Sequence, residues 1–310
     1  MKFTGKIFGI GLTILLLLVI SGCAAGSNRQ AQDPARQPAG DAADREAAVM
    51  DSFTALLQKK EVTVPAVIQF VDSNIANVSR SHAASLIIGL EQLQQEKLPQ
   101  LEDQFSASEA SQKILAKGPA GSLTDSFIST VDNHEVQTLL LTAKTGGFKV
   151  ETAEGMYFPV IDYSLYKKYR NAVTPDIAAY IDIMAAEAEK TPVKDAALRI
   201  TWAEVLQRAM TQERFIKEYG NSVKAADMRR LLQQYTAFAF YGANNTPLFS
   251  YDTGQMDPAA KQVYLTTAVT ADNGSFSQAL SGYLAVLNKN GYKLTAEVQE
   301  FRNKAMAEGR

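Results

Sequence analysis

The chain has very little of the residue types on which metal, thiol and triad chemistry depend. Its 310 residues include one cysteine and two histidines, His82 and His134, which lie far apart in the sequence. A catalytic zinc usually takes three protein ligands at characteristic spacings, so this pattern predicts no metal site. The single Cys23 excludes disulfides within the chain and a thiolate metal site. We therefore expect no metal and no cofactor, and we interpret each histidine as a surface or helix-start residue.

The sequence also lacks an excess of basic charge. It contains 31 Lys and Arg against 33 Asp and Glu, and these residues form no basic stripe. Binding to nucleic-acid phosphates requires clustered Lys and Arg, so nucleic acid is not an expected partner. The hydrophobic fraction of 46% is normal for a globular protein, so an ordinary apolar core is expected to stabilise the fold.

The first residues of the chain form the pattern of a secretory signal. Lys2 and Lys6 precede an apolar run from Ile7 to Ile20, and small residues follow it. This run is shorter than the roughly 20 residues that a helix needs to cross a bilayer. We therefore expect residues 1–22 to be removed as a signal peptide.

The sequence Ile20-Ser21-Gly22-Cys23 ends this signal with an aliphatic residue, two small residues and the only cysteine. It resembles the lipobox of bacterial lipoproteins. In that family a diacylglycerol is attached to the cysteine and the chain is cut just before it. The resemblance implies lipidation at Cys23 and anchoring at the extracytoplasmic face of a bacterial membrane. The alternative is an ordinary signal peptide followed by an unrelated cysteine, but a lone cysteine in a secreted protein needs a reason and lipidation gives one.

Residues 23–45 have the composition of a disordered tether. From Ala24 to Asp44 no aliphatic side chain is larger than Ala, and Ala, Gln, Asp, Pro and Gly predominate. Such a segment cannot bury enough apolar surface to offset the entropy lost on ordering. We expect it to let the folded part stand away from the membrane surface.

Apolar residues recur at helical spacing in two regions, 46–145 and 164–310. The pattern predicts a mainly α fold, either a multi-helix bundle or stacked helical hairpins. Pro99 is expected to end or kink one helix near Leu98, while others are expected to begin at Thr174-Pro175, Thr191-Pro192 and Asp257-Pro258. The junction Phe215–Ser222 is similar to the helix-turn-helix junction of tetratricopeptide repeats. Because no period recurs along the chain, it predicts one helical hairpin and not a repeat family.

Residues 146–163 interrupt the helical pattern with one predicted β-hairpin, near 147–162. Phe148–Thr152 and Met156–Ile161 are rich in β-branched and aromatic residues, and residues 153–155 supply a turn that contains a glycine. Two strands alone are marginally stable in water, so the hairpin is expected to lie on helices. It is interpreted as an insertion or a lid between the two helical regions.

Two short strings beside the hairpin look catalytic. Lys144-Thr145-Gly146 and Ser164-Leu165-Tyr166-Lys167 resemble the K-T-G and S-x-x-K motifs of serine penicillin-binding proteins and β-lactamases. In that family S-x-x-K comes first in the chain and a multi-stranded sheet lies behind the site, and neither holds here. The alternative is that Lys144 ends a helix and Ser164 caps the next one. We favour this structural interpretation.

Three carboxylates, Glu151, Glu154 and Asp162, surround the predicted hairpin together with aromatic residues. A glycan site would use this mixture, and glycoside hydrolysis needs two carboxyl groups roughly 5 to 10 Å apart. These three are therefore the candidate catalytic residues, with solvated turn carboxylates as the alternative. The acidic residues further along the chain are interpreted as solvated or helix-start charges, and these are Asp176, Asp182, Glu187 and Glu189.

Aromatic and amide residues also suggest ligand binding. The segment from Phe240 to Tyr251 is expected to form a loop, and functional loops on rigid scaffolds often carry such residues. A groove between this loop and the hairpin would be lined by the candidate ligand-binding residues Tyr157, Phe158, Tyr163, Asn244, Asn245 and Tyr251. The alternative is that Phe249 and Tyr251 fill the end of the core.

These patterns favour a lipid-anchored protein of the cell envelope that binds or scaffolds without catalysis. Its partner would be another envelope protein or the cell wall. The first alternative is a cell-wall glycan hydrolase that uses the hairpin carboxylates. The second is a solute-binding lipoprotein, although the alternating strands and helices of that class are missing.

Overall fold

The structure is a computed structural model that describes residues 39–118, 123–267 and 274–308. The predicted signal peptide, the lipobox with Cys23 and most of the predicted tether lie outside these ranges. Residues 39–45 belong to helix α1, so helical structure begins before the predicted boundary at residue 46. Within the described ranges, no helix is both long and apolar enough to cross a membrane.

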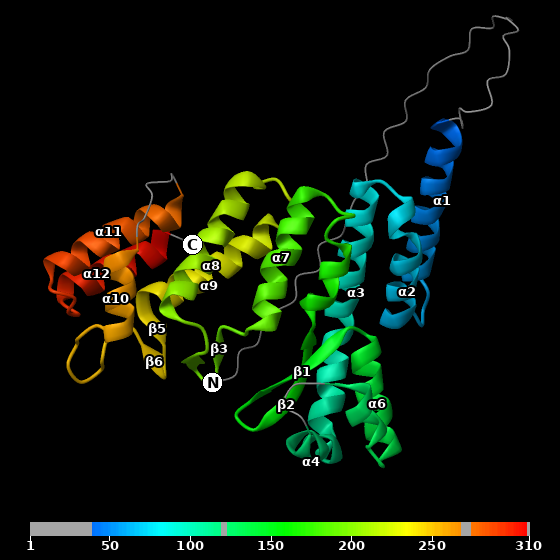
Figure 1. Cartoon of the computed structure of the whole chain (residues 1–310), viewed down its shortest axis with the longest axis horizontal. Helices are drawn as coiled ribbons and strands as arrows, with labels where there is room; N and C mark the ends of the chain where they lie inside the picture. The colour runs from blue at the N-terminus through cyan, green and yellow to red at the C-terminus, as the bar shows by residue number, and fades with distance from the viewer. Residues whose placement is uncertain (1–38, 119–122, 268–273, 309–310) are drawn as a thin grey trace, which may run out of the picture.

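The first half of the chain packs around the long helix α3 (Figure 1). Its elements are α1 (Ala39–Leu57), α2 (Val64–Asn74), η1 (Ile75–Asn77), α3 (Arg80–Ala107), α4 (Glu109–Lys117), α5 (Asp125–Ser129) and α6 (His134–Thr145). Their apolar stripes form the first core, in which Val67, Leu86, Phe105 and Leu140 have no exposed surface. His82 and His134 lie in the first turns of α3 and α6, as predicted.

The predicted β-hairpin is present with nearly the predicted bounds. Strands β1 (Phe148–Ala153) and β2 (Met156–Ile161) pair antiparallel, with Phe148 opposite Ile161. Glu154 and Gly155 form the turn with φ of +50° and +79°. Positive φ at both central residues is the requirement of the type I′ turn, whose twist matches that of the flanking strands. Strand β2 lies against α3 and α4, which supply the helical support that a two-stranded ribbon needs.

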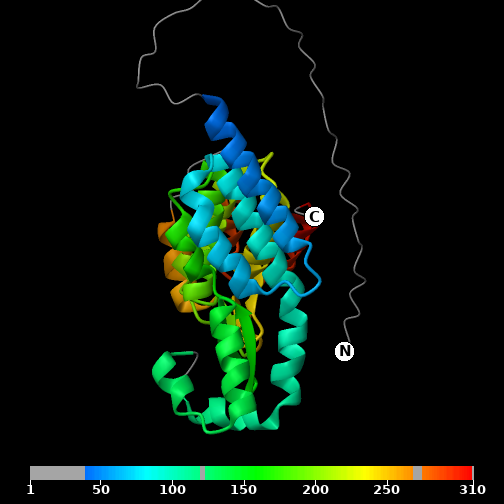
Figure 2. The ribbon, with the colours of Figure 1, turned by 90° about the vertical axis from the view of Figure 1, so that its right-hand side faces the viewer.

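The second half of the chain continues the row of helices. Its elements are η2 (Tyr163–Tyr169), α7 (Pro175–Glu189), β3 (Val193–Lys194), β4 (Ala197–Leu198), α8 (Trp202–Glu218), α9 (Ala225–Tyr241), β5 (Gly242–Ala243), β6 (Thr246–Pro247), α10 (Pro258–Thr266), α11 (Ser275–Lys289) and α12 (Ala296–Glu308). In Figure 1 the row runs from α1 and α2 at one end to α11 and α12 at the other. Figure 2 looks along the row and shows α4, α6 and the hairpin extending below it. The fold is therefore mainly α, with stacked helical hairpins and the predicted β-hairpin insertion.

The helical hairpin predicted from residues 215–222 is formed by α8 and α9, which pack closely along their lengths. A second core lies between α8 and α12, with Leu248, Leu280 and Tyr283 fully buried. The two large cores meet at a smaller apolar cluster of α7, α8 and α9 side chains, which is made of Tyr180, Ile183, Phe215 and Met228. This junction positions the groove described below.

Of the two effects expected of Pro99, an end or a kink, the structure excludes the end, because α3 continues to Ala107. A proline inside a helix costs about 3 kcal/mol relative to alanine. Leu101 and Phe105, which follow the proline, are 6% and 0% exposed in the first core. Their burial offsets the cost of the missing backbone hydrogen bond, so tertiary packing overrides the local signal.

Thr191-Pro192 also does not begin a helix. The chain instead makes the short strands β3 and β4 around a turn in which Asp195 and Ala196 have φ of +49° and +59°. Helix α8 begins only at Trp202, where the Thr201 hydroxyl accepts the Glu204 N–H at 3.2 Å. Thr201 and Glu204 have the spacing of a capping box, which the Thr191-Pro192 pair lacks because Lys194 stands at the corresponding position. The pairs at 174–175 and 257–258 do begin helices, α7 and α10.

Candidate functional site

Two of the three candidate carboxylates lie around one cavity beside the β-hairpin. Glu151 and Asp162 line a cavity of about 580 Å³ together with Lys149. Glu151 is 2.5 Å from the Lys149 amine, and its other contact is a 3.4 Å hydrogen bond from the Thr191 hydroxyl. Asp162 caps η2, because its Oδ1 accepts hydrogen bonds from the Ser164 N–H at 3.1 Å and hydroxyl at 2.6 Å. Both carboxylates thus make local structural contacts.

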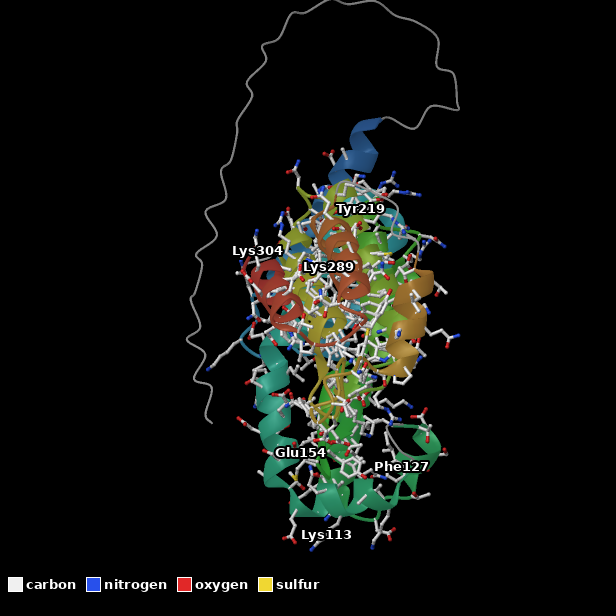
Figure 3. The ribbon with its side chains drawn as sticks, turned by 90° about the vertical axis from the view of Figure 1, so that its left-hand side faces the viewer. Lys113, Phe127, Glu154, Tyr219, Lys289 and Lys304 are labelled. Atoms are coloured by element: carbon white, nitrogen blue, oxygen red, sulfur yellow. The ribbon has the colours of Figure 1, made fainter. Side chains whose placement is uncertain are left out.

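Glu154 is the candidate carboxylate that lies apart from this cavity. It occupies the exposed turn of the hairpin, in the lower part of the view in Figure 3. Its backbone N–H donates to the Asp195 carboxylate at 2.7 Å. The turn of the first hairpin is therefore fixed to the turn between β3 and β4.

The aromatic candidates of the hairpin are built into the fold. Tyr157 exchanges two hydrogen bonds with the side chain of Gln112 on α4, both 2.8 Å long, through its backbone N–H and C=O. The Tyr163 hydroxyl donates to Glu91 at 2.7 Å, and burial, followed by the charge of Glu91, raises the pKa of this phenol. Phe158 lies opposite Glu151 in the ladder and is half-buried.

The predicted loop at 240–251 forms the tight β5–β6 hairpin instead. Asn245 donates from its backbone to the Ala196 C=O and from its side chain to the Asp195 C=O, at 2.8 Å each. Tyr251 is 78% exposed, and its hydroxyl donates to the Asn244 C=O at 3.2 Å. Phe249, by contrast, is buried in the second core as the structural alternative predicted, whereas Tyr251 is not. The β1–β2 hairpin and the 240–251 segment are thus brought together through their contacts with the 195–196 turn. The sequence did not predict this turn.

The penicillin-binding-protein-like strings have structural roles. Ser164 donates to Asp162, and the Lys167 amine lies 2.6 Å from Glu189. Lys144 is in the last turn of α6 and pairs with Asp125 at 2.5 Å. The cap of η2 is Asp162 and not the predicted Ser164, because Asp162 immediately precedes the first residue of η2 and its carboxylate accepts the Ser164 N–H, whereas Ser164 lies within η2.

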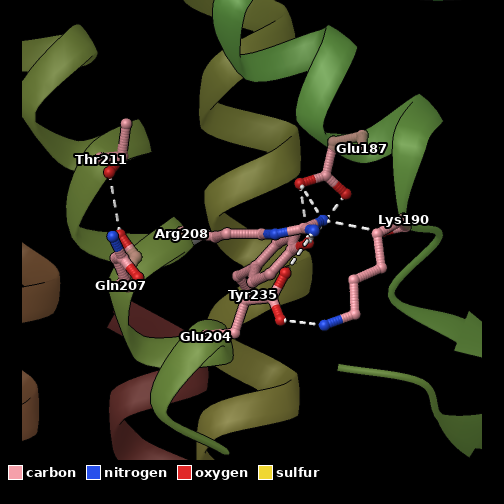
Figure 4. Close-up of polar contacts among 7 residues, drawn as sticks. All are labelled: Glu187, Lys190, Glu204, Gln207, Arg208, Thr211 and Tyr235. Atoms are coloured by element: carbon pink, nitrogen blue, oxygen red, sulfur yellow. Dashed lines mark hydrogen bonds and ion pairs between the residues drawn. The ribbon is translucent and has the colours of Figure 1, made fainter. Parts of the chain in front are cut away.

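A larger concentration of buried charge lies in the groove between α7 and α8 (Figure 4). Arg208 Nη1 is 3.1 Å from Glu187 Oε1, and Arg208 Nη2 is 2.7 Å from Glu204 Oε1. The Tyr235 hydroxyl, from α9, lies 2.7 and 2.8 Å from the two Glu187 oxygens. Lys190 completes the group at 2.5 Å from Glu204 Oε2. We call these five residues the Arg208 cluster.

The Arg208 cluster corrects the interpretation of Glu187 as a solvated charge. The side chains of Arg208 and Glu187 are only 10% and 13% exposed. Burial raises the pKa of Glu187, while the hydrogen bond from Tyr235 and the charge of Arg208 act in the opposite direction. The missed signal was spacing, since Tyr180, Ile183 and Glu187 share one helical stripe.

A second buried ion pair joins the start of α9 to α3, beside Tyr180 of the same apolar cluster. The Lys224 amine is 2.5 Å from Glu91 Oε2, and these side chains are 8% and 2% exposed. Glu91 Oε1 also accepts hydrogen bonds from the hydroxyls of Tyr163 and Tyr180. Lys224 further lies 4.7 Å from the centre of the Tyr180 ring. These contacts join the two halves of the chain through polar groups as well as through the apolar cluster.

Neither a metal site among the described residues nor a known relative helps to interpret this geometry. Among the described residues, no group of three or more His, Cys, Asp or Glu side chains could hold a metal ion. A comparison of the chain with known protein families, with curated proteins and with solved structures gives no match.

Proposed function

We propose that the chain is a lipid-anchored binding or scaffold protein of the bacterial cell envelope, held at the extracytoplasmic face of a membrane through Cys23. The lipobox-like Ile20-Ser21-Gly22-Cys23 motivates the anchor and the location. The groove between α7 and α8 motivates the binding role. The expected partner is another envelope protein.

The observation that carries the binding role is an open groove between two firmly braced helices. Its volume of about 640 Å³ lies within the roughly 300–1,000 Å³ of known ligand sites. The Arg208 cluster links the two helices, and Tyr235 links them to α9 behind. A surface that is already ordered loses less conformational freedom when a partner binds, which favours binding.

The anchor is tested by metabolic labelling of bacteria that express the full chain with a palmitate analogue. We expect label on the wild type, none on Cys23→Ala, and loss of the variant from the membrane fraction. Equal labelling of the two proteins would refute the anchor.

The binding role is tested by photo-crosslinking in cells. A benzophenone amino acid replaces Gln207, which is exposed and lines the groove, and in a control replaces Lys289 on α11. We expect a defined adduct only from position 207, and only when Cys23 is intact. Reproducible turnover of cell-wall glycans or peptides by the purified protein would contradict a role without catalysis.

One observation keeps a glycan hydrolase as the second candidate, since Glu151 and Asp162 line the same cavity. If this cavity cleaves glycans, Glu151→Gln and Asp162→Asn should each abolish turnover without changing the thermal midpoint. Glu154→Gln is the matched control, because its side chain lies outside the cavity. Absence of any turnover in the wild type, assayed on purified peptidoglycan, would remove this candidate.

A further inference from the structure

We propose that the α7–α8 groove binds an extended peptide segment of the partner and that the Gln212 amide pairs with the N–H and C=O of one residue of that segment. The inference rests on the proposed binding function and names the chemistry that the groove recognises. It starts from an unsatisfied side chain in the groove floor.

Gln212 lines the groove and has no exposed surface. Neither its Nε2 nor its Oε1 has a hydrogen-bond partner among the described residues. A buried polar group left in this state costs about 1–3 kcal/mol, and such groups are rare in folded proteins. The fold therefore carries a cost at this position that a ligand can relieve.

The other buried glutamine of the described chain shows the usual arrangement. Gln94 is 1% exposed, but its Nε2 donates to the Gly146 C=O at 2.8 Å and its Oε1 accepts from the Tyr166 hydroxyl. The neighbour of Gln212, Glu213, is also satisfied, because it accepts the Phe276 N–H at 2.6 Å. The fold thus pairs these two comparable buried side chains and leaves Gln212 unpaired in the lining of the groove.

A glutamine amide presents one donor and one acceptor side by side. In an extended chain, the N–H and C=O of the same residue point to the same side, as they do in an antiparallel ladder. One such residue can therefore satisfy both atoms of Gln212. In a trans acetamido group the N–H and C=O point in opposite directions, so the acetamido group of an N-acetylated sugar can satisfy only one of them.

The groove has the length that an extended peptide needs. Its lining residues run from Thr201 to Tyr219, beside all 17 residues of α8, which span about 26 Å. At about 3.3 Å per residue, this length accommodates roughly eight residues of extended chain. The α7 side of the groove contributes the small residues Ala179 and Ala186, which leave room for a backbone.

The paired charges that line the groove favour recognition of the ligand's peptide backbone over recognition of a charged group on the ligand. Arg208 is already paired with Glu187 and Glu204, so it does not demand an anionic ligand. The Gln212 side chain lines the groove but has no exposed surface, so it must turn toward the opening when the peptide binds. Glutamine has the rotatable bonds for this movement.

The probe for the test is a displayed library of random octapeptides, selected on the full chain in detergent with Gln212→Leu as counter-selection. Recovered peptides are synthesised with a fluorescein label and titrated by fluorescence anisotropy. We expect Gln212→Leu to weaken binding about tenfold, the loss of two modest hydrogen bonds. Gln278→Leu, at an exposed position on α11 outside the groove, should bind like the wild type. N-methylation of one central backbone nitrogen of the peptide should cause a loss of the same size.

Stability separates a lost contact from a damaged fold. Because leucine removes an unsatisfied amide, Gln212→Leu should unfold at a higher temperature than the wild type while binding peptide more weakly. A lower unfolding temperature would show that the amide is already satisfied and would overturn the inference. Equal peptide binding by the wild type and Gln212→Leu would also overturn the inference. So would displacement of the labelled peptide by tri-N-acetylchitotriose when N-methylation of the peptide has no effect on its binding. An anchor-dependent adduct at residue 207 that is unchanged in Gln212→Leu would leave the binding function standing and reject the peptide pairing.

Discussion

Replacement of Lys224 by methionine tests whether the buried ion pair with Glu91 holds the two halves of the chain together. Methionine keeps the length and the apolar stem of lysine but removes the ammonium group. The Glu91 carboxylate, 2% exposed, would then lose the charge that lies 2.5 Å from it. The hydroxyls of Tyr163 and Tyr180 would be its main remaining donors.

The magnitude follows from this burial. Removing one partner of a buried ion pair typically costs about 3–5 kcal/mol, because the other charge stays buried without compensation. An exposed pair is worth only about 0–1 kcal/mol. Lys289 and Glu297 form such a pair at 2.7 Å, with side chains 70% and 46% exposed, so Lys289→Met is the matched control. We expect Lys224→Met to lower the free energy of unfolding several times more than Lys289→Met does.

Urea unfolding followed by two signals provides the measurement. Circular dichroism reports all helices, and the fluorescence of Trp202, the only tryptophan, reports the second core. The double variant Glu91→Gln, Lys224→Met removes both charges and should be more stable than Lys224→Met alone. A cost below about 1 kcal/mol for Lys224→Met, equal to that of the exposed control, would refute the reasoning.

Three further changes probe other contacts. Burial raises the pKa of Glu187, so the folded chain keeps this proton to a higher pH than the unfolded chain does. Wild-type stability should therefore fall as pH rises through the raised pKa. Glu187→Gln should flatten this dependence in thermal melts between pH 4 and 8. Hydrogen bonds from the Ser79 hydroxyl and N–H, followed by one from His82, lower the pKa of Glu46 to about 2. The advantage of the wild type over Glu46→Gln should therefore be complete above the ordinary value of 4.5 and vanish as pH falls toward 2 in the same assay; an advantage independent of pH would contradict the assignment. A Cβ on Gly274 would lie 2.1 Å from Glu213 Cδ, so Gly274→Ala should displace the Glu213 carboxylate that caps α11. We expect this change to lower the free energy of unfolding in urea by about 1.5–3 kcal/mol. Ser275→Ala, at the exposed neighbouring position, should not lower it in this way.

Features set by local sequence were predictable. The β1–β2 hairpin depends on alternating β-branched and aromatic residues and on Gly155 in a two-residue turn, and it has the predicted position and strand bounds within one residue. The α8–α9 hairpin depends on two apolar stripes separated by the 219–224 break. In both cases the deciding patterns lie within one continuous segment of the chain, where sequence patterns are most informative.

Features set by packing between distant segments were not predictable. Pro99 stays within α3 because of burial that its local sequence does not reveal. Glu187 is buried because Arg208 and Tyr235, 21 and 48 residues further along, meet it from two other helices. Gln212 looks like an ordinary polar helix residue until the groove is formed. The one available signal of their burial was a charged or amide residue within an apolar helical stripe. Both Glu187 and Gln212 show this signal.

The contacts of the β-hairpin decide between a lid and a structural insertion. The Glu154 N–H in the turn donates to Asp195. The Tyr157 N–H in the second strand donates to Gln112, and the Lys149 amine in the first strand donates to the Ala188 C=O. Opening the hairpin as a lid would break all three contacts and would also separate β2 from α3. These ties therefore favour an insertion that braces the end of α7. The hairpin then affects binding only through α7, the helix that it supports. We therefore expect the partner to bind in the groove between α7 and α8 and not at the aromatic hairpin.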